Sequence, residues 1–536
     1  MNTKKDSRQN VVLIVCDQLR SDFLGAYGAD FIDTPNIDAL AADGVTFDNA
    51  ITAATVCGPA RASLMTGELV STHGAWTNLV PCKEGTVYLP ERMREAGYIT
   101  AATGVHDHFP VGIPLGYQYR QFYLGVKAES DYTRYLKAKY PEATGFNYSA
   151  EDGLHFKYDE EDFYDRWATD RAVEFIDCYS KTGTAPDGIA PDEEGAPFFL
   201  YCGYVSPHTP YTPPKEISGR VDGDKLPKTR TTMRFEDLPD VERNRMTYLT
   251  SHEALVDPET IMPQRTRERL AYGELVVEVD DLVGRIVKSL KENGIYENTT
   301  IIFTSDHGSM ENDYNLVDKG PWPYKAQLFI PLIVANNPRL EKGTRCDCLC
   351  GNLDVGATAL DVAGDERAFG ISRSLIGTAD GTIPEREVNI SEFCDACKNL
   401  VDKRYTFSYY PFTGKTCLYD RLEDPDETVN LGGRPEYAEI ERKFLMHAMD
   451  FMAIAKGVRI EAHDLIPIIR KGIEKKHPKF LENFPVAFPL TNEVELERLR
   501  LAGLPNDYCD FCLDREVVAT YSQGSIFSKK KWGGIS

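Results

Sequence analysis

The most informative stretch of the sequence is residues 55–67, which read Thr-Val-Cys-Gly-Pro-Ala-Arg-Ala-Ser-Leu-Met-Thr-Gly. Pro59 fixes its own φ and lacks a backbone N–H, which suits the first turn of a helix. Cys57 would then stand at or just before the helix N-terminus, where backbone N–H groups and the dipole favour an anion, with Arg61 one turn on to bind it. The pattern predicts an oxyanion held over a nucleophile, although a buried thiol beside a surface arginine would also fit.

The run from Cys57 to Gly67 resembles the signature of the type I sulfatases, a branch of the alkaline-phosphatase-like superfamily. The resemblance implies that Cys57 is oxidised after translation to formylglycine (3-oxoalanine), whose hydrate is the nucleophile. It also implies a partner, the formylglycine-generating enzyme, which reads the Cys-x-Pro-x-Arg core. The segment from Cys57 to Leu64 is most similar to phosphonate monoester hydrolases and their sulfatase relatives.

Composition limits the class of partner. The net charge is −23 at pH 7, so nucleic acids and anionic membrane surfaces would be repelled, and an anionic substrate must be drawn in by a local positive site. The apolar run Val11–Val15 is too short for a signal sequence or a membrane span. Thirteen cysteines without a secretion signal favour reduced thiols, and we expect a cytoplasmic protein.

Two apolar runs end in polar residues that suit a metal ion. Val11–Val15 and Thr299–Ser305 read as buried strands of a parallel sheet, and strand ends carry the site in such sheets. Asp17 and Gln18 follow the first run, although Asp17 would also serve as a helix cap. Asp306-His307 follows the second.

The resemblance implies that these two pairs, with the group derived from Cys57, bind one divalent ion. Histidine stands at His307 where many sulfatases have asparagine, as in the phosphonate-hydrolase relatives. Carboxylate and amide oxygens favour Ca²⁺ or Mg²⁺, and one histidine admits Mn²⁺; we expect Ca²⁺.

The resemblance also assigns residues to the substrate anion. His208, in Ser-Pro-His-Thr-Pro at the end of the predicted strand 197–204, matches a histidine that binds sulfate or protonates the leaving group, and its flanking prolines hold it rigidly. Lys319 lies where the family places a lysine on the anion, and Asn78 matches an asparagine that contacts the transferred group. Arg61 and Lys319 would share the charge of that group.

The chain departs from the commoner sulfatase pattern at residues 104–108, which read Gly-Val-His-Asp-His. Many sulfatases have Gly-Lys-x-His here, with the lysine and the histidine on the anion, and Val105 replaces that lysine. His106 or His108 would substitute for the missing group; a solvated histidine pair is the alternative.

The order of the predicted elements indicates an α/β fold, a large mixed and mostly parallel sheet sandwiched by helices, with a smaller C-terminal α+β subdomain. We expect a catalytic domain over 1–380, a subdomain with a short antiparallel sheet over 381–460, and an extension over 461–536. The role of the extension is unknown, and a contact in a homo-oligomer is one candidate. Helices are expected over 163–179 and 267–293, and 119–195 reads as an insertion. Cys394/Cys397 and Cys509/Cys512 would suit a structural zinc site, or simply be thiols.

These expectations converge on metal-dependent hydrolysis of a small-molecule or saccharide sulfate ester. A phosphonate monoester or phosphodiester hydrolase with the same nucleophile is the nearest alternative. A protein in which Cys57 stays a thiol and only binds an anion is the other.

Overall fold

The structure is a computed structural model that describes residues 8–78, 80–108, 113–123, 130–143, 150, 154–230, 258–316, 318–393, 396–411 and 413–454. Its larger sheet has eight strands in the order β4-β3-β5-β1-β6-β7-β2-β8. In chain order these are β1 (Asn10–Asp17), β2 (Gly44–Ile51), β3 (Ile99–Val105), β4 (Tyr119–Tyr123), β5 (Phe198–Pro207), β6 (Thr299–Ser305), β7 (Leu332–Ala335) and β8 (Thr344–Gly351). The predicted mixed, mostly parallel sheet is confirmed, because only β7 pairs antiparallel to its neighbours.

Strand β1 lies in the middle of the larger sheet, because its sequence is apolar on both faces. Every residue of β1 is buried, and it pairs in parallel with β5 on one side and β6 on the other. Val11 is opposite Phe199 and Thr300, so the three strands run in step. Their carboxyl ends therefore meet at one edge of the sheet.

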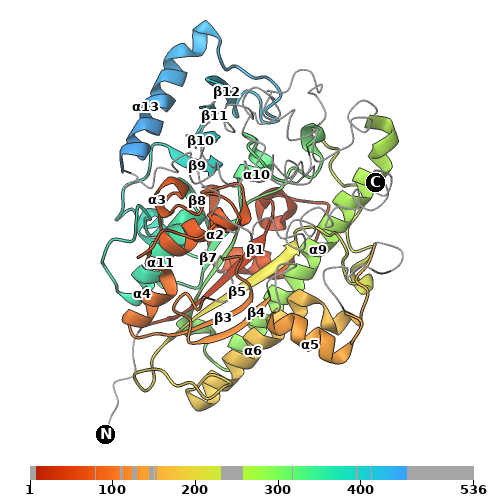
Figure 1. Cartoon of the computed structure of the whole chain (residues 1–536), viewed down its shortest axis with the longest axis vertical. Helices are drawn as coiled ribbons and strands as arrows, with labels where there is room; N and C mark the ends of the chain where they lie inside the picture. The colour runs from red at the N-terminus through yellow and green to blue at the C-terminus, as the bar shows by residue number, and fades with distance from the viewer. Residues whose placement is uncertain are drawn as a thin grey trace, which may run out of the picture.

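Helices cover both faces of this sheet (Figure 1). The helices are α1 (Pro35–Ala42), α2 (Cys57–Thr66), α3 (Val70–His73), α4 (Leu89–Glu95), α5 (Asp131–Lys139), α6 (Tyr164–Thr182), α9 (Pro258–Glu292), α10 (Lys325–Leu328), α11 (Val355–Ala363), α12 (Leu375–Ala379) and α13 (Ala438–Ile454). One face packs against α6 and α9, through residues such as Phe175 and Val279. The other packs against α2, α4 and α11, through residues such as Met65 and Leu360. Successive residues of β1 face the two cores in turn.

The first residues of the segment 119–195, predicted to be an insertion, belong to the main sheet instead. Residues 119–123 are the edge strand β4, paired in parallel with β3, and α5 follows it. Tyr119 and Tyr123 are buried between polar neighbours, and this mixed composition hides the strand from an analysis based on apolar runs. The helices predicted over 163–179 and 267–293 are α6 and α9, each longer than predicted.

A four-stranded antiparallel sheet lies above the main sheet in Figure 1, as the sequence predicts for the C-terminal part. Its strands are β9 (Asn389–Phe393), β10 (Cys397–Val401), β11 (Tyr405–Tyr410) and β12 (Lys415–Asp420), and α13 covers it through Phe444 stacked on Phe407. Glu392 forms a β-bridge with Ala54, just before α2, so the small sheet abuts the segment that leads to Cys57.

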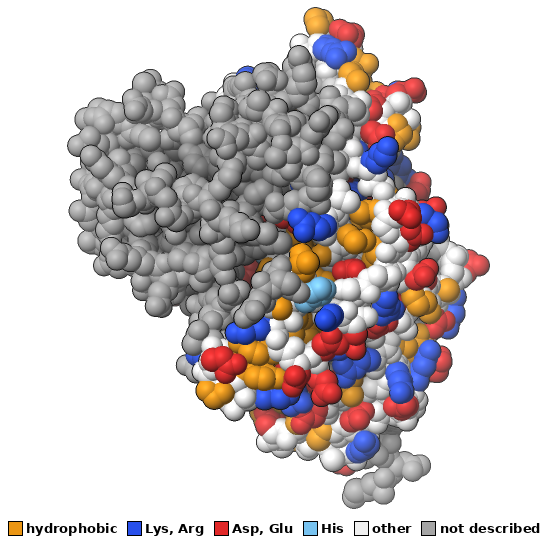
Figure 2. All heavy atoms as spheres, turned by 90° about the vertical axis from the view of Figure 1, so that its right-hand side faces the viewer, with side chains coloured by type: hydrophobic (Ala, Val, Ile, Leu, Met, Phe, Trp, Pro, Cys, Tyr) orange, Lys and Arg blue, Asp and Glu red, His pale blue; other side chains and the backbone are white. Residues whose placement is uncertain are grey.

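None of the helices in the described residues combines the length and apolar composition needed to cross a membrane. In the face shown in Figure 2, Lys and Arg side chains are interspersed with Asp and Glu, so the net negative charge is not gathered into one visible patch there. Cys394, Cys509, Cys512 and residues 461–536, on which the zinc and extension predictions depend, lie outside the described residues.

Candidate active site

The nucleophile candidate stands where the sequence predicts a helix to begin. Cys57 is the first residue of α2, after Val56 in an extended conformation, and its side chain is buried. The amide oxygen of Asn78 accepts a hydrogen bond from the backbone N–H of Gly58 at 2.7 Å. Asn78 thus satisfies one of the open N–H groups of the first helical turn and lies beside Cys57.

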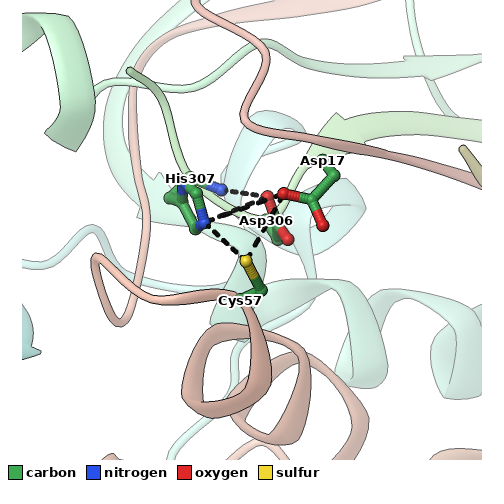
Figure 3. A group of neighbouring side chains, drawn as sticks. All are labelled: Asp17, Cys57, Asp306 and His307. Atoms are coloured by element: carbon green, nitrogen blue, oxygen red, sulfur yellow. Dashed lines mark hydrogen bonds and ion pairs between the residues drawn. The ribbon is translucent and has the colours of Figure 1, made fainter. Parts of the chain in front are cut away.

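Four residues from three distant segments converge on this point. The ligand atoms of Asp17, Cys57, Asp306 and His307 all lie within 4.8 Å of one another (Figure 3). The Cys57 Sγ is 3.4 Å from Asp17 Oδ1 and 3.2 Å from His307 Nε2. Asp17 ends β1, Asp306 and His307 follow β6, and Cys57 begins α2, so the meeting of strand ends at one edge of the sheet assembles the cluster.

The electrostatics of the cluster favour a bound cation. Burial, and then the neighbouring carboxylate of Asp306, raise the pKa of Asp17 to about 7. Burial lowers the pKa of His307, which keeps the imidazole neutral and able to offer a lone pair. Two buried acids that share a site are costly to ionise together without a positive charge between them. The donor set therefore fits a divalent cation, and it brings together four of the five ligands expected from the sequence, with Gln18 outside the group.

Arg61 supplies positive charge from the other side of the two carboxylates. Its Nε donates to Asp306 Oδ2 at 2.9 Å, and one terminal nitrogen lies 3.3 Å from Asp17 Oδ2. The other terminal nitrogen donates to the Tyr201 hydroxyl at 2.6 Å and to the Val105 carbonyl at 3.2 Å. The described structure therefore brings Arg61 to the carboxylates of Asp17 and Asp306, one turn after Cys57.

Gln18 lies at the edge of the cluster in a left-handed backbone conformation, with φ of +70°. Its backbone N–H donates to Asp306 Oδ1 at 2.9 Å, and its side-chain oxygen accepts from Lys319 Nζ at 2.9 Å. Lys319 is buried and also lies 2.7 Å from His208 Nε2. The structure thus brings three more predicted site residues together beside the nucleophile.

His208 is half-buried and held by the chain around it. Its Nδ1 contacts the carbonyl of Thr209 at 2.6 Å. Although burial and Lys319 lower its pKa, Asp17 and Cys57 outweigh them and raise the pKa of His208 to about 9. The raised pKa of His208 favours an imidazole that can carry a proton at this place.

His106 and His108 were expected to replace the missing lysine. In the described part of the chain, neither forms a hydrogen bond to the cluster. The ring of His106 packs between those of Tyr117 and Tyr201, and its Nε2 is buried without a hydrogen-bond partner there. His108 Nδ1 contacts the carbonyl of His106 at 2.6 Å. Asp107, between them, has φ of +44° and raises the pKa of Cys57 by its charge, against a lowering by Lys319.

Several residues that support the site were not found from the sequence. The hydroxyl of Tyr201 joins Arg61 to Val105, and the side chains of Thr52 and Asn352 donate to the carbonyl of Asp306 at 2.5 and 2.6 Å. Tyr201 lies within an otherwise apolar strand, and Asn352 follows β8 without a motif around it. The sequence carries no local signal for these contacts, because each joins segments that are far apart in the chain.

Comparison with known proteins places this geometry in a family. The Sulfatase family model matches residues 9–365. The multifunctional alkaline phosphatase superfamily protein PehA of Trinickia caryophylli is 30% identical over 503 residues, which cover 83% of this chain and 95% of that protein. An arylsulfatase of Clostridium perfringens is 26% identical over 473 residues, covering 81% of this chain and 92% of that protein.

A solved structure agrees in fold. The phosphonate monoester hydrolase SpPMH from Silicibacter pomeroyi superposes with a TM-score of 0.70 at 24% sequence identity, covering 83% of this chain and 96% of that one. This likeness shows the shared fold, and the family match covers the strands and the helix that deliver the cluster. The chain therefore belongs to the sulfatase family, whose enzymes hydrolyse sulfate esters.

Proposed function

We propose that the protein hydrolyses a small-molecule or saccharide sulfate ester with a nucleophile derived from Cys57. The observation that carries the proposal is the convergence of Asp17, Cys57, Asp306 and His307 within 4.8 Å at the start of α2. A formylglycine-generating enzyme would convert Cys57, and the hydrated aldehyde would supply the hydroxyl that attacks sulfur.

Asp17, Gln18, Asp306 and His307 would hold one divalent cation, and Ca²⁺ suits the mainly oxygen donor set best. Such an ion lowers the pKa of a bound hydroxyl and neutralises charge on a nonbridging oxygen of the substrate. The burial of Asp17 beside Asp306, and the raised pKa of Asp17 that results, support a cation at this place.

The surrounding residues of the chain would carry the remaining steps. As the S–O bond to the alcohol breaks, His208 would give its proton to the departing oxygen. Lys319, 2.7 Å from His208 Nε2, would share the charge that develops on the sulfate oxygens. Arg61 would hold Asp17 and Asp306 in place rather than contact the sulfate directly, since its guanidinium is committed to both carboxylates.

A phosphonate monoester or phosphodiester hydrolase is the second candidate, and the Asp306-His307 pair and Asn78 beside Cys57 favour it. The test is turnover of paired aryl sulfate and aryl phosphonate esters by protein matured with a formylglycine-generating enzyme, with Cys57→Ala as the control. Higher kcat/KM on the sulfate, lost in the control, supports sulfate ester hydrolysis. Higher kcat/KM on the phosphonate moves the protein to the second candidate, and equal rates in Cys57→Ala contradict both.

We also propose that the protein acts in the cytoplasm. All ten cysteines in the described part of the chain are free thiols, which supports a reducing compartment. Fractionation of the native host, with the protein in the fraction outside the cytoplasm, would contradict this.

A further inference from the structure

Hydrogen bonds hold the backbone N–H, the backbone carbonyl and the side-chain amide of Gln18. Its N–H donates to Asp306 Oδ1, and its carbonyl accepts from the hydroxyl of Tyr272 at 2.8 Å. A left-handed φ at a residue other than glycine persists where the surroundings fix it, and these contacts do so. The backbone of Gln18 is therefore set by residues far from it in the sequence.

The side-chain amide of Gln18 has two different ends, and only one of them can bind a cation. The oxygen accepts from Lys319 Nζ at 2.9 Å, and the nitrogen lies 3.0 Å from the hydroxyl of Ser309. A flip about the last side-chain bond would exchange these atoms at almost no steric cost. The neighbouring hydrogen bonds must therefore decide which atom faces Lys319 and which faces Ser309.

Glu311 decides the direction of the chain of hydrogen bonds. The Ser309 hydroxyl donates its single hydrogen to Glu311 Oε1 at 2.5 Å, so toward Gln18 it can only accept. The Gln18 atom that meets Ser309 must then be the amide nitrogen, and the oxygen is the atom that accepts from Lys319 Nζ. The Asp318 carbonyl, 3.5 Å from the Ser309 hydroxyl, is too distant to compete for its hydrogen.

Glu311 is itself held in place by the chain around it. The hydroxyl of Tyr211 donates to Glu311 Oε1 at 2.6 Å, and Arg269 donates to the Glu311 carbonyl at 2.9 Å. Glu311 is buried, and Gln18 is fully buried. The path from Tyr211 through Glu311 and Ser309 to Gln18 is thus continuous within the interior.

We propose that Ser309 and Glu311 are positioning residues that hold the Gln18 amide with its oxygen toward the cation site. The proposal rests on the proposed function, because Gln18 must be a ligand of the cation. Without the acceptor at Ser309, the amide keeps only Lys319 Nζ to distinguish its two ends and loses the anchor on its nitrogen, so that the oxygen would be held less firmly for the cation. The residues act through Gln18 and do not touch the substrate.

The test measures the dissociation constant for Ca²⁺ by isothermal titration calorimetry after treatment with a chelator, independently of turnover. Ser309→Ala removes the acceptor, and Glu311→Leu removes the carboxylate that accepts the Ser309 hydrogen, which frees the hydroxyl to donate elsewhere. We expect each to weaken Ca²⁺ binding by about 10- to 100-fold, as for other residues that orient metal ligands. Ser309→Thr keeps the hydroxyl, so its affinity should stay close to that of the wild type.

Ser374→Ala is the matched control, because the buried Ser374 hydroxyl caps α12 in another part of the fold. It should lower thermal stability without changing the Ca²⁺ affinity. Unchanged affinity in a folded Glu311→Leu or a folded Ser309→Ala variant overturns the inference while leaving the proposed function intact. A wild-type protein that binds none of Ca²⁺, Mg²⁺ and Mn²⁺ contradicts the proposed function itself.

Discussion

At the scale of single residues, the site depends on buried charges that compensate one another. Arg61 and Asp306 are almost completely buried and form an ion pair at 2.9 Å, and Asp17 lies on the other side of the guanidinium. Removing one partner of such a group leaves the others uncompensated in a low-dielectric interior. Arg61 and a cation bound at the cluster would each compensate in part for the loss of the other, because both neutralise Asp17 and Asp306.

The first prediction concerns Arg61→Ala. It should lower the free energy of unfolding by about 3–5 kcal/mol without metal, because two buried carboxylates lose their counter-ion. Saturating Ca²⁺ should recover part of that loss. It should raise the free energy of unfolding of Arg61→Ala by more than it raises that of the wild type, as measured by urea denaturation.

Arg92→Ala is the control for Arg61→Ala, since Arg92 pairs with Asp365 at 2.9 Å through a largely buried contact outside the cluster. Calcium should not rescue it preferentially. Equal effects of Ca²⁺ on the wild type and Arg61→Ala would argue against a shared role in neutralising Asp17 and Asp306.

The second prediction concerns the charge around Cys57 in unconverted protein. Burial raises the pKa of the thiol, but Lys319 and His208 outweigh it, so that the pKa is lowered from its ordinary value; Asp306 and Asp107 act against this. Lys319→Ala should therefore raise the pH at which alkylation by a small reagent is half-maximal, and Asp107→Asn should lower it. Shifts of the same sign in both variants would contradict the arrangement.

At the scale of elements, the ends of β1, β5 and β6 deliver the site, and one contact from a helix fixes the end of β5. The Asp165 carboxylate of α6 accepts hydrogen bonds from the backbone N–H groups of Val205 and Ser206 at 2.9 and 2.8 Å. His208 follows directly. The position of His208, the proposed proton donor, thus depends on a side chain from a different element.

The third prediction concerns the pH dependence of this contact. Burial raises the pKa of Asp165 to about 7, although hydrogen bonds from Ser206 and Val205 lower it. The folded state therefore binds more protons than the unfolded state between about pH 4 and pH 7, and stability falls as pH rises through that range. This group contributes a slope of at most about 1.4 kcal/mol per pH unit.

Urea denaturation at pH 5 and pH 8 should show this component in the wild type but not in Asp165→Asn. Asp165→Asn should also be less stable at pH 5, since an amide cannot accept from both N–H groups as well as a carboxyl can. The same pH dependence in both proteins would refute the assignment to Asp165.

The elements also show how far the sequence reaches. The apolar runs of β1, β5 and β6 and the proline in the first turn of α2 were sufficient to predict the strands, the helix and the residues at their ends, because those signals are local. Strand β4 and the hydrogen-bonding path through Ser309 were not predictable. Their stability comes from pairing with β3 and from contacts between residues hundreds of positions apart, which a single sequence does not encode locally.

At the scale of the whole molecule, the proposed function requires a protein with a net charge of −23 to bind a cation and an anionic substrate at one small site. The described cluster joins three segments spread over residues 17–307, so a bound ion would link parts of the chain that are distant in sequence. Binding there should stabilise the fold as a whole rather than one loop.

The fourth prediction is that Ca²⁺ raises the stability of the whole molecule. At a free concentration one hundred times the Kd, the gain should be about 2.7 kcal/mol, and a chelator should remove it. His307→Ala should lose most of this gain, as measured by thermal denaturation with and without Ca²⁺. A thermal midpoint that ignores Ca²⁺ in the wild type would rule out a cation at the cluster under those conditions.

The central claim is that Cys57 is converted into the nucleophile, and the mass of the peptide containing Cys57, from protein made in its native host, tests it most directly. Conversion of the thiol to formylglycine lowers the mass by about 18 Da, whereas the ordinary oxidation of cysteine adds oxygen and raises it. We predict the lower mass in protein that releases sulfate. An unmodified Cys57 in protein that turns over the substrate at full rate would contradict the account.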